Sequence, residues 1–449
     1  MPDTTLIIVA AAGILFLLFL VIRTRLQAFL ALLLTSSLVG IASGMPLDRV
    51  IDSIKNGMGG TLGFVAVVVG LGAMFGSILE ASGGIERLAG TLLNKFGEDR
   101  AQWAMGITGF IVAIPVFFDV GFIILVPLVY GLSEKSGRSL LYYGIPLAAG
   151  LAVTHSFIPP TPGPIAVAEL LKADLGWVIL FGMIAGIPAM IISGPFFGRY
   201  IAGKIHVGVP DTFQALSESG SKKIPGFATV AGIVFIPLFL ILLNTLSGVL
   251  LKGRNTETLK SFLEFIGHPF IALLIATLLA VVLLGVRSGF SREDLQKITT
   301  KALEPAGIII LITGAGGVFK QVLIDSGVGK VLADMMAASS MPAVLLAFGI
   351  AAIVRVAQGS ATVAMITAAG IISPIVAGLH LNNAALGLIV IAISAGATIL
   401  SHVNDSGFWL VSRYLGMTEQ QTLKSWTIME TIVSLTGLAV VFIISLFIM

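Results

Sequence analysis

The chain has 449 residues, of which 57% are hydrophobic and only 11% charged, and its mean hydropathy is +1.05. Soluble globular domains carry about 25% charged residues, so this composition excludes one and indicates a protein of the lipid bilayer. The sequence has no cysteine, which excludes disulfides and thiolate metal sites. The net charge of +3 is spread over connecting segments and forms no basic patch, so no nucleic-acid partner is expected.

Apolar runs recur along the whole chain. The first, Leu6 to Val21, follows an acidic residue and precedes Arg23 and Arg25, the reverse of a secretory signal, so we expect a retained helix. A membrane crossing takes about 20 apolar residues, which predicts an all-α polytopic membrane protein. The runs lie near residues 4–22, 27–44, 62–81, 103–132, 140–173, 175–198, 226–249, 268–286, 304–323, 342–378, 384–415 and 426–448.

Four of these runs are interrupted. Runs 103–132 and 342–378 are too long for one crossing, and FFDVG (117–121) and QGSAT (358–362) divide them. We expect each to form a re-entrant hairpin. Runs 140–173 and 384–415 contain THSFIPPTPGP (154–164) and SHVNDSG (401–407), which are unsuited to continuous helix. We expect broken helices there.

The chain also contains an internal repeat. Segment 70–89 aligns without a gap with segment 314–333, and eight of the twenty positions are identical. This predicts a first repeat over 1–200, a cytoplasmic linker over 201–225 and a second repeat over 226–449. Each repeat crosses five times if its split run is a hairpin and seven times if it is two spans. Both counts are odd, so the second repeat is inverted, as in many secondary transporters, with the site near the membrane midplane.

The number of crossings and their orientation follow from length and charge. Each hairpin arm has about 15 residues, short for a hydrocarbon core of about 30 Å, so ten crossings are favoured and fourteen remain the alternative. Of the 26 Lys and Arg residues, 17 fall on one side, 8 on the other, and Arg355 inside a hairpin run. The richer side is expected to be cytoplasmic, which places both termini in the periplasm.

Four longer motifs carry a resemblance to a known family. Segments 45–64, 154–176, 359–371 and 401–410 resemble the gluconate permease family of bacterial H⁺ symporters for gluconate and related hydroxy-acids. The family is distantly similar to the ion-transporter superfamily, which implies an elevator mechanism, a homodimer and an inner-membrane location. Two positions depart from relatives: many have Glu where this chain has Asp119, and several have His where it has Thr161.

The polar breaks supply the candidate site residues. A carboxylate at membrane depth is a functional hypothesis by default, and the start of a helix favours an anion. The expected substrate contacts are Gln358, Gly359, Ser360, Thr362, Asn404, Asp405, Asp119, Gly121 and Thr161. The expected proton-coupling groups are Asp119, His155, His402 and Asp405. Arg355 is expected either to bind the substrate carboxylate or to form a structural ion pair, and Ser401 and Thr154 occupy equivalent places in the two repeats.

These features predict a secondary active transporter that takes up gluconate or a related sugar acid with H⁺ as coupling ion and without a cofactor or metal. Na⁺ coupling, transport of D-serine or another small hydroxy-acid, and a channel are the alternatives. HExxH, GxSxG and Walker A patterns do not occur in the sequence, so neither an enzyme nor an ATP-driven pump is expected. Glu80, Glu169 and Glu430 are expected to be solvated or to extend towards the interface.

Overall fold

The computed structural model describes residues 3–97, 100–210, 225–250, 257–328, 330–331, 334 and 341–449. These ranges contain helices and connections but no strand, which confirms the all-α prediction. Residues 211–224 of the expected linker 201–225 lie outside the described residues, as do Leu332 and Ala333 at the end of the second repeat segment.

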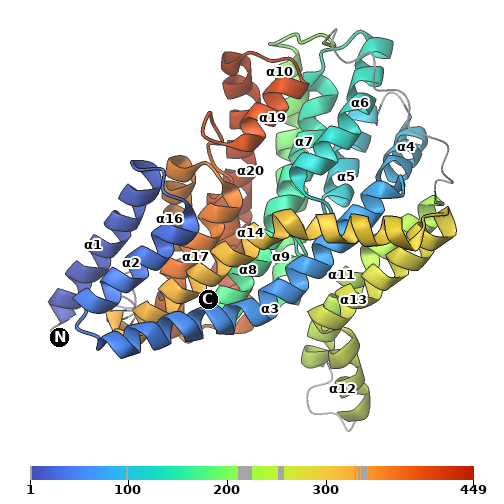
Figure 1. Cartoon of the computed structure of the whole chain (residues 1–449). Helices are drawn as coiled ribbons and strands as arrows, with labels where there is room; N and C mark the ends of the chain where they lie inside the picture. The colour runs from blue at the N-terminus through green and yellow to red at the C-terminus, as the bar shows by residue number, and fades with distance from the viewer. Residues whose placement is uncertain are drawn as a thin grey trace.

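The helices are described here in two parts of the chain, coloured blue to green and yellow-green to red in Figure 1. The first part contains α1 (Asp3–Ile22), α2 (Ala28–Ala42), α3 (Leu47–Ala81), α4 (Gly84–Phe96), α5 (Ala101–Val112), α6 (Phe118–Ser136), α7 (Leu141–Phe157), α8 (Pro162–Leu171), α9 (Leu175–Ile191) and α10 (Phe197–Ala202). The second part contains α11 (Phe227–Leu250), α12 (Glu257–Ile266), α13 (Pro269–Ala280), α14 (Arg292–Asp325), α16 (Ala343–Gln358), α17 (Ala361–Gly378), α18 (Asn383–Gly396), α19 (Ser406–Tyr414) and α20 (Glu419–Ile448). Each part thus has one very long helix, a pair of shorter helices, an interrupted helix and a long apolar segment.

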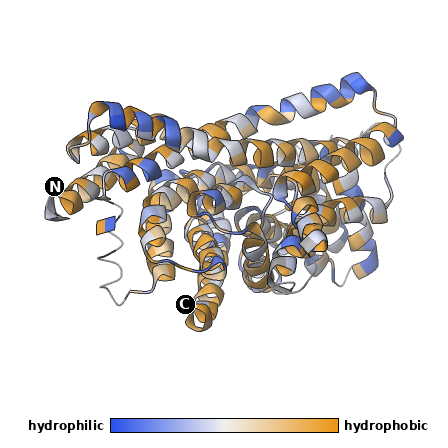
Figure 2. Ribbon diagram, turned by 90° about the horizontal axis from the view of Figure 1, so that it is seen from below, coloured by the Kyte–Doolittle hydropathy of each residue, from blue (hydrophilic) through white to orange (hydrophobic). Residues whose placement is uncertain are grey.

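Most helical turns are hydrophobic (Figure 2). Among the described residues, eight helical segments are long and apolar enough to cross a membrane, so the protein is a multi-pass membrane protein. Helices α5 and α16, with 12 and 16 residues, reach only about 18 and 24 Å at 1.5 Å per residue. Both are shorter than a hydrocarbon core of about 30 Å.

The longest helices, α3 and α14, lie side by side and extend across the molecule (Figure 1). Gly57 of α3 and Gly317 of α14 allow a close approach, since a Cβ on Gly57 would lie 2.6 Å from the Gly317 carbonyl oxygen. Small residues at such contacts let membrane helices pack backbone to backbone. Near one end of the pair, the Ser53 hydroxyl donates a hydrogen bond of 2.6 Å to the Asp325 carboxylate.

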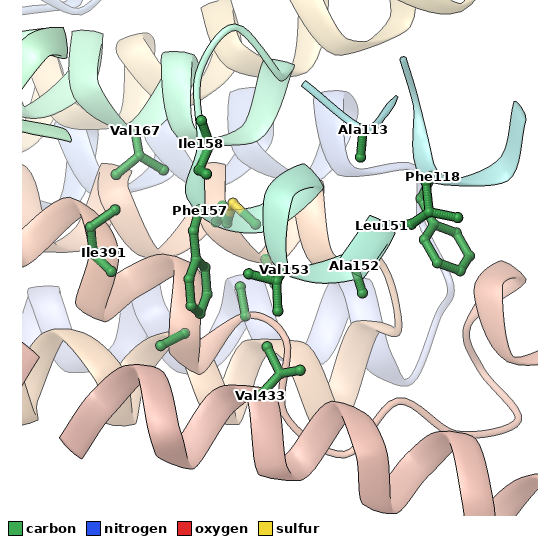
Figure 3. Close-up of a cluster of buried hydrophobic side chains, with 14 of the residues drawn as sticks. Ala113, Phe118, Leu151, Ala152, Val153, Phe157, Ile158, Val167, Ile391 and Val433 are labelled. Atoms are coloured by element: carbon green, nitrogen blue, oxygen red, sulfur yellow. The ribbon is translucent and has the colours of Figure 1, made fainter. Parts of the chain in front are cut away.

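The end of α7 is fixed by packing around Phe157, which is fully buried (Figure 3). A Cβ on Gly182 of α9 would lie 2.3 Å from the Phe157 carbonyl oxygen, and a Cβ on Gly437 of α20 would lie 2.7 Å from its ring. Two prolines, at 159 and 160, then stop the helix because they cannot donate backbone hydrogen bonds. The chain resumes as α8 at Pro162, and His155 and Ser156, at the end of α7 just before this break, line the central cavity described next.

Candidate functional site

A cavity of about 560 Å³ lies where the interrupted helices meet. We call it the central cavity. Its wall is formed by the start of α6, the end of α7, the middle of α14, the start of α17, the start of α19 and one face of α20. The volume lies in the range typical of small-molecule sites. Its polar and charged wall residues are Asp119, His155, Ser156, Arg355, Ser360, Thr362, Thr398, Asp405, Ser406, Trp426 and Glu430.

The start of α17 opens into the central cavity. Gly359 ends α16 with φ +87°, a conformation that glycine adopts without strain, so the chain reverses there. Ser360 is the N-cap residue of α17 and its hydroxyl accepts a hydrogen bond from Val363 N at 3.4 Å. Ser360 and Thr362 both line the cavity. The free N–H groups and positive end of the helix dipole, together with two hydroxyls, form a suitable environment for a carboxylate.

The start of α6 opens into the same cavity. Asp119 lies in the first turn of this helix, it is exposed to the cavity, and it forms no hydrogen bond with another described residue. The carboxylate thus lies at the positive end of the α6 dipole. His155 of α7 also lines the cavity, with its ring edge towards the ring of Phe117 at 6.2 Å between centroids. Its Nδ1 is buried and has no hydrogen-bond partner among the described residues.

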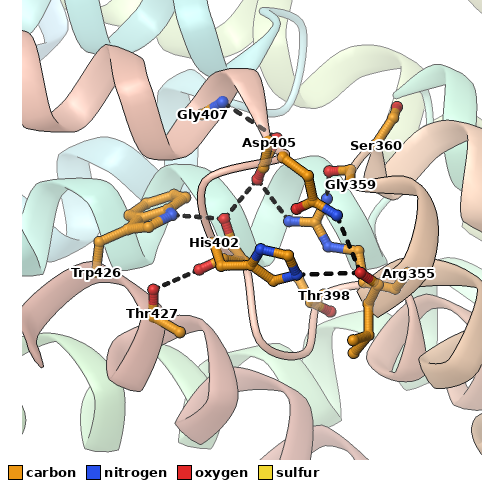
Figure 4. Close-up of polar contacts among 12 residues, drawn as sticks. Arg355, Gly359, Ser360, Thr398, His402, Asp405, Gly407, Trp426 and Thr427 are labelled. Carbon is orange, nitrogen blue, oxygen red and sulfur yellow. Dashed lines mark hydrogen bonds and ion pairs between the residues drawn. The ribbon is translucent and has the colours of Figure 1, made fainter. Parts of the chain in front are cut away.

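Asp405 is the centre of a buried network (Figure 4). Its Oδ2 accepts hydrogen bonds from Arg355 Nη2 at 2.5 Å and from the Ser401 hydroxyl at 2.5 Å, and its Oδ1 accepts one from Gly407 N at 3.1 Å. Trp426 Nε1 in turn donates to the Ser401 hydroxyl at 2.7 Å. Arg355 is 2% exposed and donates a further hydrogen bond to the Gly359 carbonyl. Of the two roles expected for Arg355, the structure shows the ion pair with Asp405.

His402 and Asn404 lie at the end of α16 rather than at the cavity wall. Asn404 Nδ2 donates to the Val356 carbonyl at 2.9 Å, and His402 Nε2 lies 3.0 Å from the same oxygen. The histidine contact is a hydrogen bond when Nε2 carries the proton. Both side chains therefore satisfy a carbonyl that the helix end leaves without an intrahelical partner. They join the α16–α17 loop to the break between α18 and α19.

Several other expected contacts also lie outside the cavity wall. The Thr161 hydroxyl donates to the Ile158 carbonyl at 2.7 Å, within its own turn. Gly121 packs against Leu151, because a Cβ at 121 would lie 2.8 Å from the Leu151 side chain. The Thr154 hydroxyl and Gln358 Oε1 are buried without a hydrogen-bond partner among the described residues. This geometry does not support a direct substrate contact at Gly121, Thr161 or Gln358.

Glu430 lies at the cavity, although the sequence indicated a solvated or snorkelling position. This expectation is wrong, because Glu430 is 3% exposed and lines the central cavity from α20, one turn after Trp426. An acid inside a long apolar run is itself a functional signal in a membrane protein, and that signal could have found it. Glu169 pairs with Lys172 at the end of α8, and Glu80 is exposed in a neighbouring cavity of about 390 Å³.

One of the long helices brings only apolar side chains to the cavity. Helix α14 contributes Pro305, Ile308, Ile309 and Ile312 to the central cavity. The polar groups of the cavity wall therefore come from the interrupted helices and α20, and none comes from α14.

The fold is shared with a solved structure. The YdaH transporter of Alcanivorax borkumensis superposes with a TM-score of 0.61 at 18% sequence identity, over 87% of this chain and 88% of that one. The fold and the cavity thus define a polytopic, all-helical membrane protein with a polar cavity between interrupted helices.

Sequence comparison identifies the family. Residues 4–447 match the model of the GntP family permeases. The low-affinity gluconate transporter of Escherichia coli (strain K12) is 43% identical over 437 residues, which cover 97% of each chain. The Gnt-II system L-idonate transporter of the same organism is 40% identical over 432 residues, 96% of this chain and 97% of that one. The chain belongs to the GntP permease family, and it is therefore a membrane transporter and not an enzyme.

Proposed function

We propose that the protein takes up gluconate or a closely related sugar acid together with protons. One observation carries this proposal: the start of α17, with Ser360 and Thr362, and the start of α6, with Asp119, open into the same cavity. The first provides N–H groups and hydroxyls for a carboxylate, and the second provides a group that can bind a proton. A substrate anion beside ionised Asp119 is unfavourable, so substrate binding favours proton uptake.

The rest of the polar wall suits a polyhydroxylated chain. Ser156, Thr398 and Ser406 bring hydroxyl groups to the cavity from three different elements. The Ser156 and Ser406 hydroxyls can each donate one hydrogen bond and accept others, as the alcohol groups of a sugar acid require. The Thr398 hydroxyl donates to the Ser394 carbonyl at 2.8 Å and can only accept from a substrate. The relatives named for gluconate and L-idonate transport support the same substrate class.

Alternating access provides the mechanism we favour. The pairs α5–α6 and α16–α17 are assigned as re-entrant hairpins of two inverted repeats over residues 1–200 and 226–449, in the ten-crossing arrangement. Their loops approach one cavity, and α5 and α16 are short for a crossing, which supports this assignment. We assign the protein to the inner membrane. The loop charges favour periplasmic termini. The resemblance to the ion-transporter superfamily favours a homodimer that works by an elevator movement.

Transport by the purified protein in proteoliposomes tests the proposal. A carrier shows counterflow, in which labelled gluconate enters against unlabelled gluconate inside, whereas a channel does not. Without Na⁺, adding gluconate outside should make the external medium more alkaline as protons enter with it. L-idonate and D-serine, added in parallel, define the substrate range. Loss of counterflow would exclude a carrier, and Na⁺-dependent uptake without a pH change would exclude proton coupling.

A further inference from the structure

Glu430 is an acidic residue of the central cavity, and the proposed function gives it no role. It is 3% exposed, it lines the cavity, and it forms no hydrogen bond or ion pair with any described residue. The Asp405 carboxylate, by contrast, accepts three hydrogen bonds, one of them from Arg355. While the cavity holds water, that water can solvate an ionised Glu430; without water or another partner the ionised carboxylate is unfavourable and the neutral acid is tolerated.

The groups that face Glu430 do not supply the missing partner. Arg355 of α16 and Asp405 at the start of α19 both act on Glu430 electrostatically. Their charges largely cancel because they form an ion pair of 2.5 Å with each other. Helix α7 contributes His155 to the cavity, and the described residues of α9 and α18, which also pack on α20, include no titratable side chain. Glu430 therefore faces a nearly neutral surrounding.

Two acidic side chains at the cavity wall lack a counter-charge among the described residues. With Arg355 and Asp405 paired, two acids remain at the wall, Asp119 at the start of α6 and Glu430 on α20. A substrate carboxylate adds a third negative charge in the same space. It also displaces water from the cavity, which removes the solvation that an ionised Glu430 would otherwise have. Both effects favour the neutral acid in the loaded state.

We propose that Glu430 is a second proton-binding group of the transporter, separate from Asp119, which takes a proton from bulk water when the substrate anion binds and returns it on release. This inference rests on the proposed function, since it assumes that an anion enters the cavity with protons. Two acids that are ionised in the empty carrier and neutral in the loaded one imply two protons for each monovalent sugar acid. Transport then moves net positive charge inward.

The coupling ratio tests this proposal in proteoliposomes. The membrane voltage at which radiolabelled gluconate flux reverses, at fixed gluconate and pH gradients, gives the number of protons per substrate. The wild type should give about two, and Glu430→Gln should lose one of them. Glu419→Gln is the matched control, because Glu419 is an exposed residue at the start of the same helix. It should keep the wild-type ratio.

A second measurement needs no variant. Gluconate added to the wild-type protein in weakly buffered detergent solution should cause uptake of about two protons per bound gluconate. Uptake of one proton would overturn the proposal, as would an unchanged ratio in Glu430→Gln with only a weaker gluconate affinity, which would make Glu430 a ligand for hydroxyls. If the wild type transports gluconate without any proton, the proposed function itself fails.

Discussion

The backbone of Gly359 lies directly against the backbone of Asn404. A Cβ on Gly359 would stand 2.2 Å from the Asn404 carbonyl oxygen, and Gly359 has φ +87°. The Asn404 side chain also donates to the Val356 carbonyl at 2.9 Å. The loop between α16 and α17 and the break between α18 and α19 are therefore in contact through main chain and side chain, and we expect them to move as one unit.

Gly359→Ala should destabilise the protein and abolish transport. A non-glycine residue at positive φ costs roughly 1–2 kcal/mol, and the overlap with Asn404 adds to this. Thermal unfolding in detergent and gluconate counterflow measure the two effects. Gly137→Ala is the control, because Gly137 has φ +67° with open space around it. This variant therefore reports only the cost of placing a non-glycine residue at positive φ. Equal losses in the two variants would contradict the packing that we describe.

Asp119→Asn should retain gluconate exchange and lose one of the two coupled protons, so that the gluconate accumulation driven by a given pH gradient falls but does not vanish. The amide imitates the protonated carboxyl, so the loaded state remains accessible while its proton is no longer exchanged. Asp119→Glu should keep coupling because it retains a titratable group at the start of α6. Radiolabelled uptake with and without a pH gradient distinguishes the two variants. The wild-type accumulation ratio in Asp119→Asn at the same pH gradient would exclude Asp119 as a coupling group.

Asp405→Asn should lower stability strongly. Removing one partner leaves the buried guanidinium of Arg355 without its counter-charge, which typically costs about 3–5 kcal/mol. A double-mutant cycle measures the coupling, with Asp405→Asn and Arg355→Met made alone and together and unfolding followed for each. The double variant should lose less unfolding free energy than the two single variants lose when their losses are added. Additive losses would show that the ion pair contributes little.

Thr362→Val and Ser360→Ala should each weaken gluconate binding by about 1 kcal/mol, since each removes a hydroxyl from the cavity wall. Asn404→Ala is expected to act differently, because Asn404 binds the end of α16 and not the cavity. It should lower thermal stability in the absence of substrate. Thr300→Val, at an exposed position of α14, should change neither property. Equilibrium binding and thermal unfolding without ligand separate these outcomes.

Ser136→Cys and Asn383→Cys should react with a membrane-impermeant thiol reagent from opposite sides of the membrane. Both positions are exposed, and the natural sequence contains no other cysteine. Asn383 is preferable to its neighbour Asn382, whose side chain caps α18 by accepting from Ala385 N at 2.8 Å. The expectation follows from the inverted repeats, and labelling from the same side would contradict them.

The polytopic class follows from composition alone, and the helix interruptions coincide with local sequence features. Helix α6 begins within FFDVG, and α16 ends within QGSAT. Proline, glycine and small polar residues interrupt helices locally, so their positions can be recognised without tertiary information. The sequence also drew attention to Asp119 and Ser360 because each stands beside such an interruption.

The other half of the wall depends on packing between distant segments. Glu430 and Trp426 stand on a continuous helix, and only the fold decides which face of α20 meets the cavity. Asn404 and Thr161 lie at interruptions like Ser360 does, yet their side chains satisfy backbone carbonyls instead. Local sequence indicates where polar groups are needed but not which partner each one finds.

The apolar wall of α14 has a mechanical consequence. Ile308, Ile309 and Ile312 have no side-chain hydrogen-bonding group to offer the cavity, so the elevator movement that we propose would break no hydrogen bond at these residues. Dispersion contacts between aliphatic side chains are weak singly and are readily exchanged for equivalent ones. Farther along α14, Lys320 Nζ donates to the Leu170 carbonyl at 2.6 Å, at the end of α8. If α8 moves along α14 in that movement, this hydrogen bond has to break, so it would favour the arrangement seen here over a displaced one.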